Sequence, residues 1–248
     1  MIYSESESNR FGLNVYRLNV SSDTFENLEA EMLDLDVDIL IIRIATNLLD
    51  NFNRIILTEY SKIFTDTLVY YSKKLTRNLN YEVRNERFSW REAKTGDIPK
   101  IVDLVKSVFE NYQNHYTANP VFKYSDILDG YTEWTLRHIE SENKNFFLVE
   151  DINQLVGFAC CSYKDAHELE GVIFGVSNDY SGMGVYTDMI RYTQNYFSKE
   201  GFQNMVVSTQ VQNQTVQRVW TKEGFQLDHS YFTFHLCRLQ KPHANPLQ

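Results

Sequence analysis

Residues 170–199 read EGVIFGVSNDYSGMGVYTDMIRYTQNYFSK, and this stretch decides the fold. Its apolar beginning predicts a buried strand, and its end repeats apolar residues at helical spacing. The loop between them, residues 177–184, carries glycines at positions 182 and 184. A strand, a glycine turn and a helix start bring main-chain N–H groups and the positive end of a helix dipole to one point. The stretch therefore predicts an anion cradle that needs neither a metal nor a lysine.

A G-x-G spacing is a weak signature alone, because many turns between a strand and a helix need glycine. A second block, MVVSTQVQNQTVQRVWTKEGF at residues 205–225, makes the interpretation more specific. It predicts a strand, then a helix capped by Asn213 with Val216 and Trp220 on one face, and a stop at Gly224. The two blocks in this order are much rarer than either block.

Together the two blocks resemble the GCN5-related N-acetyltransferase (GNAT) superfamily, whose motifs are R/Q-x-x-G-x-G/A and N-x-x-A-x-x-x-Y-x-x-x-G-F. The aligned positions of this chain are Ser181, Gly182, Gly184 and Tyr186, followed by Asn213, Val216, Trp220, Gly224 and Phe225. Three of them depart from the family. Ser181 replaces arginine or glutamine, Tyr186 replaces a small residue, and Trp220 replaces the tyrosine.

The departure at Trp220 concerns the proton that the family's tyrosine gives to the leaving thiolate of coenzyme A. An indole N–H donates a hydrogen bond but does not give up its proton. Another group or water then supplies the proton, or the thiolate leaves unprotonated, which a thiol pKa of about 8.5 makes tolerable.

The resemblance implies acetyl-CoA as the cofactor, without a metal. Its phosphates are expected on the loop and helix start, at Ser181, Gly182, Met183, Gly184, Val185 and Tyr186, with Asn213 and Trp220 nearby. Its pantetheine arm resembles an extended peptide, so we expect it to pair with the strand before the loop, at Phe174, Gly175 and Val176. A main-chain N–H of that strand would hold the oxyanion while an amine attacks the thioester directly.

His115 is the leading candidate for the base that takes the amine proton. It lies in NHYTANP, in a loop expected to cover the acceptor site, and an imidazole pKa near 6.5 suits this task. A structural role for His115, packed against a neighbouring tyrosine, is equally open. Glu170 and Glu168 are rivals, since strand alternation places both on one face with Val172 and Phe174. The candidate acceptor contacts are Tyr116, Asn119 and Tyr131, whereas Trp134 and Trp220 are expected in the core.

Within the superfamily the chain most resembles nucleotide-sugar N-acetyltransferases of the TDP-4-amino-4,6-dideoxygalactose (TDP-fucosamine) type, which serve surface polysaccharide biosynthesis. The similar segments are FGLNVYRL, DTLVYYS, NHYTANP, GVYTDMI and STQVQNQTVQRVW. The resemblance implies a TDP- or UDP-linked amino sugar as the acceptor. Acetylation of a protein N-terminus or a small free amine, and a catalytically degenerate fold that only binds a ligand, are the alternatives. An unrelated nucleotide-phosphate domain is disfavoured because no Walker lysine follows Gly184.

Composition agrees with an enzyme of the cytoplasm. The 248 residues are 43% hydrophobic and contain no apolar run of transmembrane length. The net charge of −9 disfavours nucleic acid as a partner. The three cysteines are too few and too scattered for a disulfide scaffold or a metal site. An anionic ligand would need a local basic patch, for which the candidates are Arg137, Lys164, Arg191 and Arg218. A homodimer is the default expectation.

The order of expected elements predicts an α/β fold with a mixed, mostly antiparallel sheet. We expect a small N-terminal α/β domain at residues 1–85, closed by a strand at residues 66–75, and then an acetyltransferase domain at residues 86–241 and a tail at residues 242–248. The first ten residues are expected to fray. Residues 76–87 are expected to form a linker, and strands at residues 205–209 and 231–239 are expected to form a final pair.

Overall fold

The computed structural model describes residues 1–20, 25, 27–77, 79–139 and 144–239. The expected tail at residues 242–248 lies outside these residues. The chain packs into two compact units. The first comprises residues 1–67, 114–122 and 230 onward, and the second comprises residues 68–113 and 123–229. Two long strands, β4 (Tyr60–Lys74) and β10 (Gln226–Arg238), contribute residues to both units.

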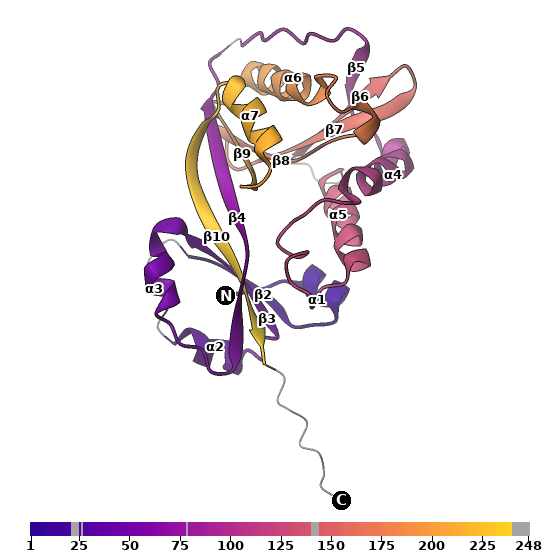
Figure 1. The fold of residues 1–248 in the computed structure, drawn as a ribbon. Helices are drawn as coiled ribbons and strands as arrows, with labels where there is room; N and C mark the ends of the chain where they lie inside the picture. Colours follow the sequence, from indigo (N-terminus) through magenta and orange to yellow (C-terminus); the bar gives the residue numbers. More distant parts are fainter. Residues whose placement is uncertain (21–24, 26, 78, 140–143, 240–248) are drawn as a thin grey trace, which may run out of the picture. The chain divides into compact units, whose positions relative to one another are not determined.

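The first unit is a sheet with the strand order β1-β2-β3-β10-β4 (Figure 1). Its other elements are β1 (Ile2–Tyr3), α1 (Glu5–Phe11), β2 (Val15–Val20), α2 (Leu28–Asp34), β3 (Ile39–Ala45), a 3-10 turn (Thr46–Leu48) and α3 (Leu49–Asn53). Strands β2 and β3 are parallel, whereas β1 with β2 and β3 with β10 are antiparallel.

The two faces of this sheet differ in chemistry because side chains alternate along each strand. One face carries Leu40, Ile42 and Ile44 of β3 with Phe234 and Leu236 of β10, and residues of α2 and α3 pack on it. The opposite face carries the buried Ile39 and Ile41 of β3 together with polar groups of β2, β3 and β10, and residues of α1 and of the 114–122 loop contact it. The first unit therefore has one apolar core face and one face that gathers its buried polar groups, called the polar face below.

The second unit is a sheet with the strand order β10-β4-β9-β8-β7-β6-β5. Its elements are β5 (Phe88–Glu92), a 3-10 turn (Thr95–Asp97), α4 (Ile98–Phe109), α5 (Tyr124–Ile139), β6 (Lys144–Asp151), β7 (Gln154–Tyr163), β8 (Glu168–Val176), a 3-10 turn (Asn178–Tyr180), α6 (Val185–Lys199), β9 (Asn204–Gln210) and α7 (Gln214–Lys222). Helices α6 and α7 cover one face, and α4 and α5 cover the other (Figure 1).

The predicted fold class is confirmed, because the strands of both units belong to one ten-stranded sheet that is mixed and mostly antiparallel. Two expectations about strands are wrong. Strand β4 does not simply close an N-terminal unit, since its residues 68–74 pair with residues 204–210 of β9. For the same reason β9 and β10 do not form a final pair, because β4 lies between them. A boundary near residue 85 stays a prediction, although the compact units divide the chain differently.

The expected fraying of the first ten residues is also wrong. They form β1 and most of α1, and Glu7 is buried at 3% exposure. Glu7 accepts hydrogen bonds from Arg17 on β2 and from Ser4. A buried carboxylate requires such partners, and the partners hold this helix on the sheet.

Candidate functional site

The loop between β8 and α6 has the geometry that the glycines predict. Gly182 and Gly184 have φ of +77° and +82°, a region that favours glycine strongly, and Gly184 is the residue before α6. The loop closes on itself, since Tyr180 N donates to Ser177 O at 2.9 Å and Ser181 N donates to Asn178 O at 3.1 Å. Residues 181–184 are exposed.

The main-chain N–H groups at the start of α6 are available for an anion. The first helical bond runs from Asp188 N to Gly184 O at 3.0 Å. The N–H groups of Val185, Tyr186 and Thr187 form no hydrogen bond within the described part of the chain, as expected for a first helical turn. The loop and these N–H groups form the cradle, defined here as residues 181–187. Its geometry is present, and its binding of phosphate stays a prediction.

Strand β8 has an open edge immediately before the cradle. On one side β8 pairs with β7 as far as Val176, but on the other side it pairs with β9 only from Glu168 to Gly171. Residues 172–176 thus have no strand partner on the β9 side among the described residues. This segment contains Phe174, Gly175 and Val176, so an extended ligand can add to the sheet there.

A β-bulge in β8 corrects one expectation about the glutamates. The register with β7 shifts so that Cys160 faces Ile173 and Cys161 faces Gly171, which leaves Val172 as the extra residue. Alternation is interrupted at Val172, and Phe174 therefore packs with the α6 side of the sheet. Glu170 lies on the other face, opposite to Phe174. The Nζ of Lys164 lies 3.7 Å from Glu168 and 3.8 Å from Glu170, so both rivals are in ion pairs.

The two unusual aromatic residues of the motifs are in direct contact. Trp220 is buried at 3% exposure, and its indole N–H donates to the Tyr186 hydroxyl at 3.1 Å. The Tyr186 ring also lies edge-to-face with Phe174 of the open edge, with centroids 6.2 Å apart. Burial raises the pKa of the Tyr186 hydroxyl, so it stays protonated at neutral pH. Trp220 thus stands where the family has a tyrosine, and the hydroxyl of Tyr186 contacts its indole.

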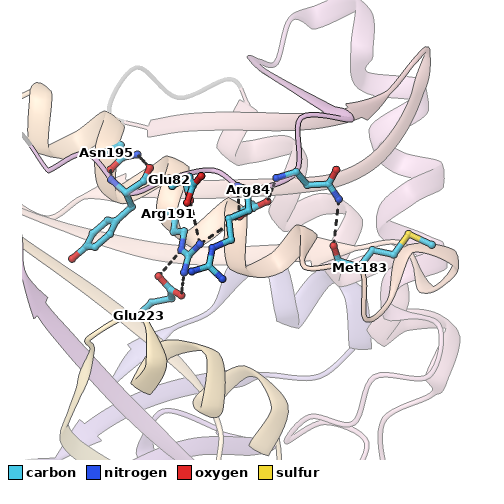
Figure 2. A network of polar contacts seen from close by, with 9 residues as sticks. Glu82, Arg84, Met183, Arg191, Asn195 and Glu223 are labelled. Carbon is cyan, nitrogen blue, oxygen red and sulfur yellow. Dashed lines mark hydrogen bonds and ion pairs between the residues drawn. The ribbon is translucent and has the colours of Figure 1, made fainter.

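The expected linker at residues 76–87 is instead bonded along α6. Asp188, 3% exposed, accepts from Arg84 N at 3.1 Å and from Asn85 N at 3.0 Å. The Asn195 side chain accepts a hydrogen bond from Tyr81 N and donates one to Tyr81 O. Asn85 Nδ2 donates to Met183 O at 3.5 Å (Figure 2). The segment therefore holds the first turn of α6 and the cradle loop in place.

The basic candidates are mostly neutralised by carboxylates. Arg191 donates twice to Glu223, both times at 2.8 Å, and this pair ties α6 to α7 (Figure 2). Lys164 is occupied by the two glutamates of β8, and Arg137 pairs with Glu133 at 3.4 Å. Arg218 is exposed, and within the described chain its one hydrogen bond goes from NH2 to Oε1 of Gln214 at 3.5 Å. The predicted patch does not form from these four residues.

His115 lies in the first unit, and the structure does not give it the environment of a solvent-exposed base. It is 6% exposed, and its Nδ1 lies 2.9 Å from Nε2 of His235 on β10. Burial, together with His235 and the arginines Arg17 and Arg43, lowers the pKa of His115 well below its usual value. Burial also lowers the pKa of His235 to about 3. The pKa of each ring therefore lies below the expected value near 6.5, and both rings are neutral at pH 7.

Two predicted acceptor contacts belong to the same polar face. Asn119 is 1% exposed and donates to His235 Nδ1 at 3.0 Å. The Tyr116 hydroxyl donates to Glu7 and accepts from Arg17 NH2 at 2.7 Å, and burial raises its pKa. Within the first unit these side chains are already engaged with the protein.

Tyr131 belongs to the second unit, where its ring stacks on Phe109 of α4 with centroids 4.2 Å apart. The core prediction is confirmed for Trp220 and wrong for Trp134, which is 38% exposed. No sequence pattern predicts the Trp220 contact with Tyr186 or the buried pair of Glu7 and Arg17, because each depends on how one element packs on another. Asn213 is the cap of α7, as predicted, and its side chain accepts from Val216 N.

Among residues 1–20, 25, 27–77, 79–139 and 144–239, no cluster of His, Cys, Asp and Glu could hold a metal ion. Cys160, Cys161 and Cys237 are buried and unbridged. In the same described ranges, none of the helices combines the length and apolarity needed to span a membrane.

Comparisons with known proteins agree with this geometry. Residues 105–225 match the model of the acetyltransferase (GNAT) family. No curated protein matches the chain. A functionally unknown conserved protein from Staphylococcus epidermidis is similar in structure, with a TM-score of 0.60 and 12% identity over 96% of this chain and 90% of that chain.

Two solved GCN5-related N-acetyltransferases are also similar. The protein from Kribbella flavida has a TM-score of 0.57 and 11% identity over 91% of this chain and 80% of that chain. The protein from Sphaerobacter thermophilus has a TM-score of 0.56 and 14% identity over 86% of this chain and 65% of that chain. At these identities the likeness establishes the fold, and the family model adds the sequence match across the cradle and α7. Residues 105–225 are therefore similar in sequence to the acetyltransferase (GNAT) family, and the chain has the fold of these two solved N-acetyltransferases.

Proposed function

We propose that this enzyme transfers an acetyl group from acetyl-CoA to the amine of a nucleotide-linked amino-deoxy sugar by direct attack. The observation that carries the cofactor half of the proposal is the open edge of β8 leading directly into the cradle. Main-chain N–H groups of residues 185–187 suit a diphosphate, and the unpaired edge at residues 172–176 suits an extended amide chain. Both features come from the backbone, so the departures at Ser181 and Tyr186 leave them intact.

Acetyl-CoA supplies an acyl group activated as a thioester. The chain's contribution is to hold that thioester beside the bulged segment of β8, where a main-chain N–H can stabilise developing negative charge on the carbonyl oxygen. The amine nitrogen forms the new amide bond as the carbon–sulfur bond breaks, and the amine loses one proton to water or a base.

We assign the proton for the departing sulfur to the Tyr186 hydroxyl. This group is held by the Trp220 indole at 3.1 Å and lies against the open edge through Phe174. Its raised pKa keeps the proton available at neutral pH. It would take over the role that the family gives to a tyrosine at the position of Trp220.

The nucleotide-sugar acceptor is supported by the segments that resemble that subgroup and by the additional N-terminal residues. The test is mass spectrometry after incubation with acetyl-CoA and a panel of TDP- and UDP-linked amino sugars, with the free amino sugars as controls. We expect a mass gain of one acetyl group on a nucleotide-linked member and not on its free sugar. Transfer to the free sugars, or to peptides with free N-termini, would move the acceptor to the alternative class and leave the family assignment intact.

A further inference from the structure

A row of polar residues crosses three adjacent strands on the polar face of the first unit. Asn19 of β2 pairs in register with Arg43 of β3, and Arg43 pairs with Thr233 of β10. Residues directly opposite each other in neighbouring strands project to the same face. An amide, a guanidinium and a hydroxyl thus lie side by side, and each can donate a hydrogen bond.

Two atoms of this row are buried without a partner. Arg43 Nε and Thr233 Oγ1 form no hydrogen bond with the part of the chain that the structure describes, and Thr233 is 0% exposed. Such groups are rare in folded proteins, because each one gives up its hydration without compensation. The guanidinium also stays charged at every pH at which proteins fold, so a partner for its buried Nε is best supplied by an anion.

The neighbouring titratable groups do not supply that anion. Glu7 is already paired with Arg17, with NH2 of Arg17 at 2.8 Å from Oε1. His115 and His235 are neutral at pH 7, and Arg43 is among the charges that lower their pKa values. Among the described residues, neither Glu7 nor the two histidines therefore compensates the charge of Arg43.

We propose that Asn19, Arg43 and Thr233 form a binding site for an oxyanion, the phosphate or carboxylate group of a small molecule. Each of the three residues supplies at least one donor, and the guanidinium supplies the charge. Asn19 is exposed and Arg43 is partly exposed, so the row is open to solvent at that end. Neighbouring strands lie about 4.8 Å apart, so adjacent side chains of the row are close enough to donate to one oxyanion group. This inference goes beyond the proposed transfer and does not depend on its acceptor.

Isothermal titration calorimetry of the full chain at constant ionic strength tests the site, with inorganic phosphate, thymidine diphosphate and acetate as separate probes. We expect at least one probe to bind the wild type. Arg43→Gln should weaken that binding by at least about tenfold, since a charge-assisted hydrogen bond is lost. Thr233→Val should weaken it by about threefold or more, whereas Thr233→Ser should retain it. The ranking of the three probes tells a free phosphate, a nucleotide diphosphate and a carboxylate apart.

Arg54→Gln is the matched control, because Arg54 is an exposed arginine of the same unit, and its variant should bind like the wild type. Failure of all three probes to bind the wild type would overturn the proposal, as would equal affinities of the wild type and the Arg43→Gln variant. If Arg43→Gln does not fold, the contrast between Thr233→Val and Thr233→Ser decides, and equal affinities of these two would overturn it. Acetyl transfer is not part of the readout, so the outcome is separate from that of the proposed function.

Discussion

The cradle of the second unit and the polar face of the first unit differ in which polar groups they carry and in how exposed those groups are. The cradle exposes main-chain N–H groups and relies on hardly any side chain, whereas the polar face buries two imidazoles, a carboxylate and a phenol in mutual hydrogen bonds. His115, the base candidate that the sequence suggested in a loop over the acceptor site, lies on this polar face. The comparison teaches that a polar side chain in a loop is no evidence of access to substrate. It also predicts that the two regions respond to different measurements.

The largest expected effect is a loss of stability in acid, caused by the polar face. The pKa of His115 and that of His235 are lower in the folded protein than in the unfolded chain, so the unfolded state binds more protons below about pH 6.5. The stabilisation is therefore complete above about pH 7 and is lost as the pH falls toward the folded pKa. Between pH 7 and pH 5 we expect a loss of about 2 kcal/mol for each imidazole.

Urea unfolding at pH 5, 6 and 7 measures this dependence, and the His235→Asn variant should show about half of it. A variant with the same slope as the wild type would show that other groups cause the loss. The acetyl-CoA affinity of the folded protein should stay nearly constant over this range, because the cradle contains no group that titrates there.

The next effect contrasts two buried phenols, one in each region. Tyr186→Phe should lower kcat by about a hundredfold, the lower end of what a general acid contributes, and should leave coenzyme A affinity unchanged. Tyr116→Phe, which removes the hydroxyl between Glu7 and Arg17, should instead lower stability by about 1–3 kcal/mol with little change in kcat. Steady-state kinetics and urea unfolding of both variants measure the contrast. Loss of activity only in Tyr116→Phe would reverse the assignment of the two regions.

The part of the site that sequence predicts is the part that depends on local backbone. The positive φ at Gly182 and Gly184 follows from their position between a strand and a helix, and the fold class follows from alternation and helical spacing. Burial of His115 depends on His235, 120 positions away, and the contact between Tyr186 and Trp220 joins two helices. The β-bulge at Val172 likewise moves Phe174 to the other face, and no residue pattern announces it. Local geometry is therefore predictable here, whereas side-chain environment requires the tertiary structure.

Gly184→Val tests the cradle itself and should weaken acetyl-CoA binding by about tenfold, since a left-handed backbone costs about 1–2 kcal/mol for a residue with a Cβ and more for a branched one. A Cβ at Gly184 would meet nothing within 4 Å, so the effect arises from backbone strain and not from a clash. Gly12→Val is the matched control, because Gly12 has φ of +64° and equally open surroundings in the first unit. Calorimetry with acetyl-CoA should show weaker binding for the first variant only. Equal affinities of the two variants would remove the cradle from the cofactor site.

The smallest expected effect concerns the segment that holds the cradle loop. Asn85 donates to Met183 O at 3.5 Å, a long hydrogen bond, so Asn85→Ala should weaken acetyl-CoA binding by only about twofold. Asp188→Asn should have a larger effect than Asn85→Ala, because Asp188 accepts from two main-chain N–H groups of the segment and an amide offers one oxygen for them. Glu133→Gln on α5, which covers the opposite face of the sheet from α6, serves as the control with wild-type affinity. If Asp188→Asn binds acetyl-CoA like the wild type, the cradle keeps its shape without its bonds to residues 76–87. The glycines of the cradle alone would then account for its exposed main-chain N–H groups, which the polar face does not have.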